Sequence, residues 1–119
     1  MEDAHDLMPE ELAKQVPPLG ATAEQSSPVA QVKWFTPWSN WTWYVIEYDP
    51  KHQIAYGLVE GLVTEYGDFA QKEIEELRGG GIPIRHGRTK KVIGQLGGLR
   101  VERDLYFKPT PVKQLSPEA

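Results

Sequence analysis

The sequence predicts an α+β fold, with an antiparallel sheet of about four to six strands and one or two helices packed on one face. Three observations lead to this prediction. Residues 32–62 are rich in aromatic and β-branched residues and contain all four tryptophans. Two segments outside this stretch, 7–19 and 69–81, carry apolar residues at helical spacing. The length of 119 residues fits a single domain covering 1–119.

The segment LMPEELAKQVPPL at 7–19 is expected to form the first helix. Pro9 suits its first turn, where the missing N–H costs nothing, and Pro17 and Pro18 end it. Its docking face would carry Leu12, Val16 and Leu19. Residues 1–6, before this helix, are expected to be flexible.

Residues 41–48 are the strongest predicted strand, flanked by a first strand at 31–35 and a partner strand at 53–63. The turn segments TPWSN (36–40) and DPKH (49–52) separate the three. Because side chains alternate along a strand, one face would hold Trp41, Trp43 and Val45, and the other Thr42, Tyr44, Ile46 and Tyr48. Both faces are apolar, which indicates a central strand that is covered on both sides.

In the partner strand, Gly57 and Gly61 are expected to leave room for an indole from its neighbour. The apolar residues of its other face are Ile54, Tyr56, Leu58 and Leu62. Tyr66-Gly67 is expected to end this pair of strands.

A second helix is expected to begin at Asp68 as N-cap, with Gln71 completing a capping box. Its buried stripe would be Phe69, Ala70, Ile74 and Leu77. The solvated face would carry Glu73, Glu75 and Glu76. Gly79 to Gly81 would end it.

Residues 80–98 are expected to form an inserted loop or hairpin bounded by glycines. Either IPIR and KKVIGQL pair around a turn at His86-Gly87, or a short helix begins at Thr89. Residues 101–107 would then form the last strand of the sheet. Residues 112–119 are expected to be flexible.

The net charge of −4 conceals an uneven distribution. Residues 1–77 carry four Lys/Arg and fourteen Asp/Glu, a net −10, whereas residues 78–119 carry nine and three, a net +6. Such a split indicates either an interaction surface or an internal match, in which the basic segment packs beside the acidic helix.

Several classes of function find no support in the sequence. The absence of cysteine removes disulfides, thiol nucleophiles, zinc ribbons and a lipidated anchor. His5, His52 and His86 are isolated, so no metal site is predicted. No GxSxG, P-loop or GxGxxG motif occurs, and no catalytic residue or cofactor is assigned. No apolar run approaches the roughly 20 residues that span a bilayer, and no signal peptide is visible, so we expect a cytoplasmic protein without membrane contact.

Five segments resemble, in order, domain-of-unknown-function family 2958. They are MPEELAKQVPPL, VKWFTPWSNWTWYVIEYD, YGLVEGL, EIEELRG and ERDLYFKPTPVKQL. The resemblance covers residues 7–115, and NWTWY (40–44) and ERDLYFKP (102–109) are its most specific parts. In the family the ERDL strand follows the helix more closely, so residues 80–98 look like an addition. Family members are small proteins encoded largely in bacteria, often on plasmids, phages and integrative elements. No activity is established for them, so the resemblance implies a mobile-element accessory protein and no particular chemistry.

Two groups of residues are candidates for binding. The four tryptophans form either a stacking platform or the core; Trp38 lies in a turn, is expected to be the most exposed, and is the platform candidate. The segment 78–103 contains one acid, Glu102, and is either a phosphate-binding patch or a solvated loop. Its candidate contacts are Arg85, His86, Arg88, Lys90, Lys91 and Arg100.

The acidic residues of the paired strands are expected to be solvated. They are Glu47, Asp49, Glu60 and Glu65. Arg103 and Asp104 alternate across the last strand, so one of them should face inward and need a partner. Arg103 is expected to pair with Glu47 or Glu60.

We therefore expect a non-enzymatic binding or adaptor protein that acts through a protein partner, as a monomer or small homo-oligomer. The alternative is a nucleic-acid-associated protein that contacts DNA or RNA phosphates through residues 78–103. The third hypothesis, an enzyme, has no nucleophile–base pair or metal-ligand pattern to support it.

Overall fold

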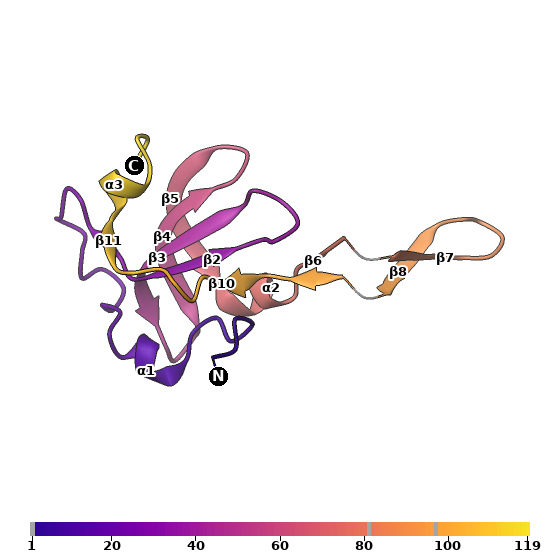
Figure 1. The fold of residues 1–119 in the computed structure, drawn as a ribbon, viewed down its shortest axis with the longest axis horizontal. Helices are drawn as coiled ribbons and strands as arrows, with labels where there is room; N and C mark the ends of the chain where they lie inside the picture. Colours follow the sequence, from indigo (N-terminus) through magenta and orange to yellow (C-terminus); the bar gives the residue numbers. More distant parts are fainter. Residues whose placement is uncertain (1, 81, 97) are drawn as a thin grey trace.

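The computed structural model describes residues 2–80, 82–96 and 98–119, and it confirms the α+β class. Its main element is a five-stranded antiparallel sheet with the order β10-β2-β3-β4-β5 (Figure 1). These strands are β2 (Val32–Phe35), β3 (Thr42–Asp49), β4 (Ile54–Glu60), β5 (Thr64–Ala70) and β10 (Glu102–Arg103). The three short helices are α1 (Glu10–Ala13), α2 (Gln71–Glu75) and α3 (Val112–Leu115).

Strand β3 lies at the centre of the sheet, as its aromatic composition predicts. Six consecutive residues from Trp43 to Tyr48 are buried, so the sheet is covered on both faces. The pairing with β4 shifts in register between Val45 and Glu47, which makes Ile46 the extra residue of a β-bulge.

Because of this bulge, the predicted face of Tyr48 is wrong. Tyr48 packs in the cluster of Trp43 and Val45, whereas Tyr44 and Ile46 belong to the cluster on the opposite side. We expected Tyr48 to share the face of Tyr44. One inserted residue inverts the alternation of every residue that follows it.

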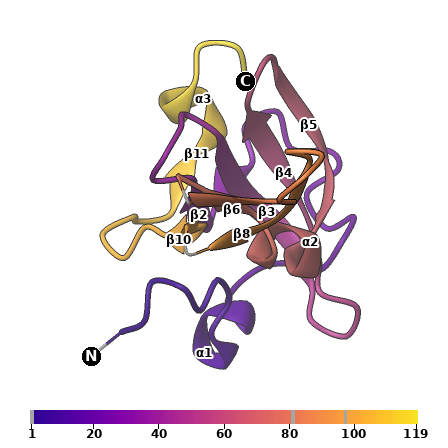
Figure 2. The same ribbon diagram turned by 90° about the vertical axis from the view of Figure 1, so that its right-hand side faces the viewer.

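The larger core cluster is covered by the N-terminal segment and α2. Trp34 is fully buried in it, and its Nε1 donates a hydrogen bond to Leu7 O (2.7 Å). Ile74 of α2 and Val16 complete the cover. On the other side, Val112 of α3 is fully buried against Tyr44, so α1 and α3 lie on opposite sides of the sheet (Figures 1 and 2).

The chain between Thr64 and Ala70 is a strand, and the prediction that Asp68 caps a helix is wrong. Strand β5 pairs with β4 at seven positions from Ile54↔Ala70 to Glu60↔Thr64, and this pairing outweighs the local capping signal. Helix α2 begins only after Ala70, without a side-chain cap. Leu62 lies in the tight turn between the strands and is 93% exposed, so it does not share the face of Ile54.

Residues near both ends of the described chain contact the sheet, and the expected flexibility of the terminal segments stays a prediction. Arg103 N donates to Ala4 O (2.7 Å), which ties residues near the N-terminus to β10. Strand β1 (Val29–Ala30) pairs with β11 (Thr110–Pro111), and α3 follows directly. A buried apolar residue, Val112, anchors this C-terminal part.

The described residues between Arg78 and Arg100 form an outlying ribbon, and we call the segment 78–100 the arm. At its stem β6 (Arg78–Gly79) pairs with β9 (Leu99–Arg100), and β7 (Ile82–Arg85) pairs with β8 (Val92–Leu96) to form a hairpin. Of the two predicted alternatives, the hairpin is therefore correct. Figure 1 shows the arm extending away from the sheet, which gives the molecule extents of 56 × 32 × 25 Å. The glycines expected to end the second helix lie in and after β6, and Gly81 falls outside the described residues.

Candidate nucleic-acid interface

The arm carries all six predicted phosphate-binding residues of the basic segment, and all are exposed. They are Arg85, His86, Arg88, Lys90, Lys91 and Arg100. His86 N donates to Lys91 O (2.8 Å) and Lys90 N donates to His86 O (3.0 Å), which closes the turn. The His86 Nδ1 atom accepts hydrogen bonds from the amides of Arg88 and Thr89, each at 3.3 Å. Backbone and imidazole atoms thus shape the tip, while its cationic groups face solvent.

The cations of the arm have no carboxylate partner in the part of the chain that the structure describes. There, ion pairs join Lys14 to Glu10 and Lys33 to Asp104, and two histidines to nearby aspartates, none of them in the arm. Arg78 contacts α2 through backbone oxygens, with its Nη1 donating to Glu75 O (2.6 Å). No ion pair among these residues supports the alternative in which the acidic helix neutralises the basic segment.

Charge is divided between the arm and the rest of the protein. The arm holds six Lys/Arg and no Asp/Glu, and the remainder holds seven and seventeen, which gives +6 and −10. At the stem, Arg78 and Arg100 occupy directly opposed positions of the antiparallel pair. Like charges placed opposite each other on neighbouring strands repel, so an anion between or beside them would stabilise the stem.

The four tryptophans have different environments. Trp34 is fully buried and Trp43 is 6% exposed, whereas Trp41 is 37% exposed. Trp38 is half-buried and packs partly on the larger core cluster. The prediction that Trp38 is the most exposed indole is therefore wrong, because the turn folds its ring back onto the start of the arm.

Two indole rings each lie flat against a glycine. A methyl group on Gly79 would overlap Cδ2, Cε2 and Nε1 of Trp38. A methyl group on Gly61 would likewise overlap the six-membered ring of Trp41, which confirms that Gly61 leaves room for an indole. The other predicted position, Gly57, instead accommodates the backbone of Tyr44.

A pocket of about 370 Å³ lies between these rings at the base of the arm, and we call it the indole pocket. Its lining residues are Thr36, Trp38, Ser39, Trp41, Trp43, Leu77 and Arg78. The Trp41 and Trp43 rings lie 6.0 Å apart with an interplanar angle of 32°. The Trp41 amide donates to Thr36 Oγ1 (3.2 Å), and this hydroxyl also bonds to Ser39, so the polar groups of the wall hold its turn together.

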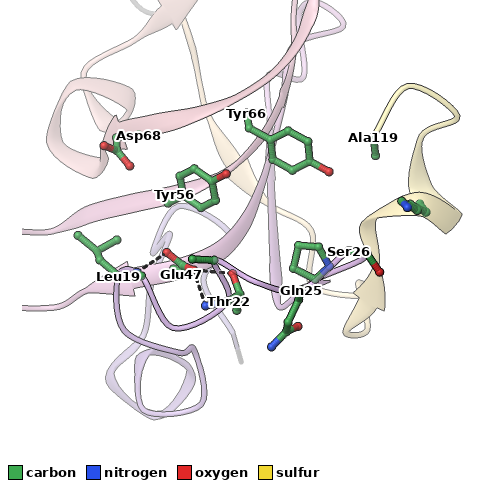
Figure 3. A pocket seen from close by; sticks show the side chains of 13 residues that line it. Leu19, Thr22, Gln25, Ser26, Glu47, Tyr56, Tyr66, Asp68 and Ala119 are labelled. Atoms are coloured by element: carbon green, nitrogen blue, oxygen red, sulfur yellow. Dashed lines mark hydrogen bonds between the residues drawn. The ribbon is translucent and has the colours of Figure 1, made fainter.

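A second pocket, of about 640 Å³, lies on the other side of the sheet around Glu47 (Figure 3). Glu47 is 4% exposed, and its carboxylate accepts hydrogen bonds from Gly20 N (2.7 Å), Thr22 N (2.8 Å) and Thr22 Oγ1. Burial alone would raise the pKa of Glu47, but these three hydrogen bonds outweigh it and hold the pKa below its ordinary value. The carboxylate therefore stays ionised and fixes the loop around residues 20–22 to β3.

Sequence reasoning missed Glu47, since it assigned the carboxylates of the strands to solvent. A signal existed: Glu47 stands in the middle of the most apolar strand, where an acid has to find partners. Beside it, the rings of Tyr56 and Tyr66 stack at 6.3 Å. Burial raises the pKa of Tyr66, and the neighbouring Tyr56 adds to this effect, so its hydroxyl remains protonated at neutral pH.

The predicted partners of Arg103 are wrong. Arg103 is 6% exposed, and its Nε donates to Asp6 O (2.9 Å) instead of to Glu47 or Glu60. The N-terminal segment, which folds against β10, supplies this carbonyl oxygen. Asp104 faces the other way and pairs with Lys33 Nζ at 3.7 Å.

Within the described ranges no three His, Cys, Asp or Glu side chains gather closely enough to hold a metal ion. No helix in these ranges has the length and apolar character that crossing a membrane requires.

The fold and its candidate sites define a small α+β protein with an acidic sheet body and a basic hairpin arm. The chain belongs to the family described as Protein of unknown function (DUF2958), whose model matches residues 6–116 and confirms the resemblance noted in the sequence. No curated protein and no solved structure matches the chain.

Proposed function

We propose that this protein is a non-enzymatic binding protein that contacts the phosphates of a nucleic acid with its arm. The observation that carries the proposal is the arm itself, an outlying hairpin whose cations are exposed and lack carboxylate partners among the described residues. Phosphate binding by such side chains releases counterions from the nucleic acid, which provides the affinity. The mobile-element context implied by the family resemblance agrees with a partner of this kind.

The uneven distribution of charge should direct an approaching nucleic acid to the arm. A net −10 on the rest of the chain repels phosphates, while +6 on the arm attracts them, so approach along the arm is favoured. A two-stranded ribbon has the width that the major groove of a duplex admits. It can equally lie along a single strand, because phosphate contacts by themselves do not depend on base pairing.

A salt series measures this contact. Fluorescence anisotropy of a labelled oligonucleotide should show affinity that falls linearly on a log–log plot as salt rises. With four or five phosphate contacts the slope would be about −3 to −3.5 for a single strand and about −3.6 to −4.5 for a duplex. The variant Lys90→Glu/Lys91→Glu should lose most of the affinity while its melting temperature stays close to that of the wild type.

A matched control distinguishes the effect of the arm's cations on binding from the effect of net charge alone. Lys14→Glu/Lys51→Glu changes the net charge by the same amount, and both lysines are exposed on the body. It should keep most of the affinity. Absence of binding at low salt, or equal loss in the two double variants, would refute the arm as the phosphate-contacting element.

As a second candidate, the protein is an adaptor that binds a protein partner. Strand β5 is an edge of the sheet, and the turn before it exposes Leu62 (93%) and Val63 (64%). Exposed apolar residues beside a free strand edge favour pairing with another chain. Partner capture that survives in Lys90→Glu/Lys91→Glu and is lost in Leu62→Glu/Val63→Glu would support this candidate, and equal capture by all forms would refute it.

A further inference from the structure

The indole pocket and the arm form one continuous surface. Gly79, on which Trp38 lies, is a residue of β6, and Arg78 both lines the pocket and begins the arm. Cations at the stem and aromatic rings at the pocket are thus neighbours. This combination, a basic track beside aromatic faces, is the one that single-stranded nucleic-acid sites use.

The rings of the pocket are positioned before any ligand arrives. Gly79 and Gly61 let the backbone approach Trp38 and Trp41 so closely that each ring is supported along one side. Hydrogen bonds of the Trp41 amide to the Thr36 and Ser39 hydroxyls fix the turn that carries it. Trp41 nevertheless remains 37% exposed. A supported ring with an accessible surface loses little conformational freedom on binding.

The side chains that line the indole pocket determine what it can bind. Its hydroxyls are engaged within the turn, so the wall offers a ligand aromatic surfaces and the Leu77 side chain, with the Arg78 guanidinium beside them. A volume of about 370 Å³ lies at the small end of the usual range for ligand pockets, about 300–1,000 Å³. Flat aromatic groups stack on such surfaces whatever their hydrogen-bonding edge.

From this arrangement we propose that the indole pocket stacks an unpaired nucleobase, while Arg78 and Arg100 contact the adjacent phosphates, so that the protein prefers single-stranded to duplex nucleic acid. The inference rests on the proposed function and names its substrate class. A base inside a duplex is already stacked and paired, and it would have to leave the helix to enter the pocket. Because stacking is tolerant of base identity, the site discriminates weakly between sequences.

The test compares one sequence in two forms. A labelled oligonucleotide of about 16 nucleotides, as DNA and as RNA, is titrated as a single strand and as the matching duplex at equal salt. The wild type should bind at least one single strand about tenfold more tightly than its duplex. Trp41→Leu should lose this preference but keep its affinity for the duplex, which depends on the tip of the arm.

Two controls make the outcome specific. Tyr106→Leu removes an aromatic ring that is 92% exposed and lies outside the pocket, and it should keep the preference. Lys90→Glu/Lys91→Glu should weaken both forms by a similar factor. If Trp41→Leu fails to fold, tryptophan emission of the wild type replaces it, since the single strand should quench the emission more strongly than the duplex at saturation.

The possible results distinguish this inference from the proposed function. Equal affinity for the two forms, or equal loss of both in Trp41→Leu, would overturn the base-stacking site and leave phosphate binding by the arm intact. Failure of the wild type to bind either form at low salt would overturn both.

Discussion

Charged side chains have opposite environments in the sheet body and in the arm. In the body the charged group Glu47 is buried and has three hydrogen-bond donors, and no buried side-chain nitrogen or oxygen of the described residues lacks a partner. In the arm the cations are exposed, and Arg78 stands directly opposite Arg100. The buried charge of the body therefore has its partners within the protein, whereas the cations of the arm have no carboxylate partner among the described residues.

This contrast separates stability from function. Substitutions in the body outside the indole pocket should change the free energy of unfolding and affect binding only through it, because these residues serve packing. Substitutions in the arm should change binding and leave the free energy of unfolding nearly constant.

Trp34→Ala should cause the largest loss of stability. The ring is fully buried in the larger core cluster and its Nε1 satisfies Leu7 O, so truncation leaves a cavity and an unpaired carbonyl. We expect a loss of about 3–5 kcal/mol in the free energy of unfolding, measured by urea denaturation. Tyr106→Ala, at a ring that is 92% exposed, should cost less than about 0.5 kcal/mol. A loss below about 1 kcal/mol for Trp34→Ala would contradict the central place of this ring in the core.

Glu47→Gln should cost less, about 1–3 kcal/mol at neutral pH, because it weakens three hydrogen bonds to a charged acceptor. The wild-type contribution depends on pH. The folded pKa of Glu47 lies below its ordinary value of 4.5, so the stabilisation is fully present above that pH and is lost as pH falls through the folded pKa.

The difference between the wild type and Glu47→Gln should therefore shrink in acid. Urea denaturation from pH 7 down to about pH 3 measures it. Glu65→Gln, at an exposed position of β5, is the control and should show little difference at any pH. If the difference in the free energy of unfolding between the wild type and Glu47→Gln stayed constant through the acid range, the stabilisation by Glu47 would not depend on its ionised form.

The sequence was sufficient for the parts of the fold that depend on local composition. The density of aromatic residues predicted β3, and the glycines around 80–98 predicted an inserted hairpin as one of two alternatives. The sequence also identifies the cationic residues of the arm, because charge depends on residue type and not on the fold.

The errors share a physical cause: contacts between distant residues override local signals. Asp68 has the side chain of a helix cap, but pairing with β4 places it in a strand. The bulge at Ile46 and the carbonyl oxygens that hold Arg103 depend on the neighbouring chain segments, which the local pattern does not encode. The exposure of Trp41 relative to Trp38 likewise follows from how the turn folds back onto Gly79.

Removal of the outer part of the arm should leave stability almost unchanged. Replacing residues 80–98 by Asn-Gly joins Gly79 to Leu99 through the two-residue turn that suits an antiparallel pair. The free energy of unfolding should change by less than about 1 kcal/mol, whereas duplex binding, which depends on the tip of the arm, should disappear. A much larger loss of stability would show that the arm supports the body, and retained duplex binding would contradict the tip of the arm as the phosphate-contacting element.

The smallest effect should come from Arg100→Glu, and its two consequences should have opposite signs. The new carboxylate would face Arg78 across the stem, replacing repulsion by attraction. The stem should gain about 0.2–1 kcal/mol, seen as slower amide hydrogen exchange at Gly79 and Leu99. Binding of a single strand should weaken, since one phosphate contact is lost and an acid stands in its place. Arg100→Gln is the matched control, because it removes the repulsion without adding attraction. It should fall between the wild type and Arg100→Glu both in amide exchange and in binding. If Arg100→Glu strengthened the stem and binding together, the opposed arginines would be a structural feature of the stem with no role toward an anion.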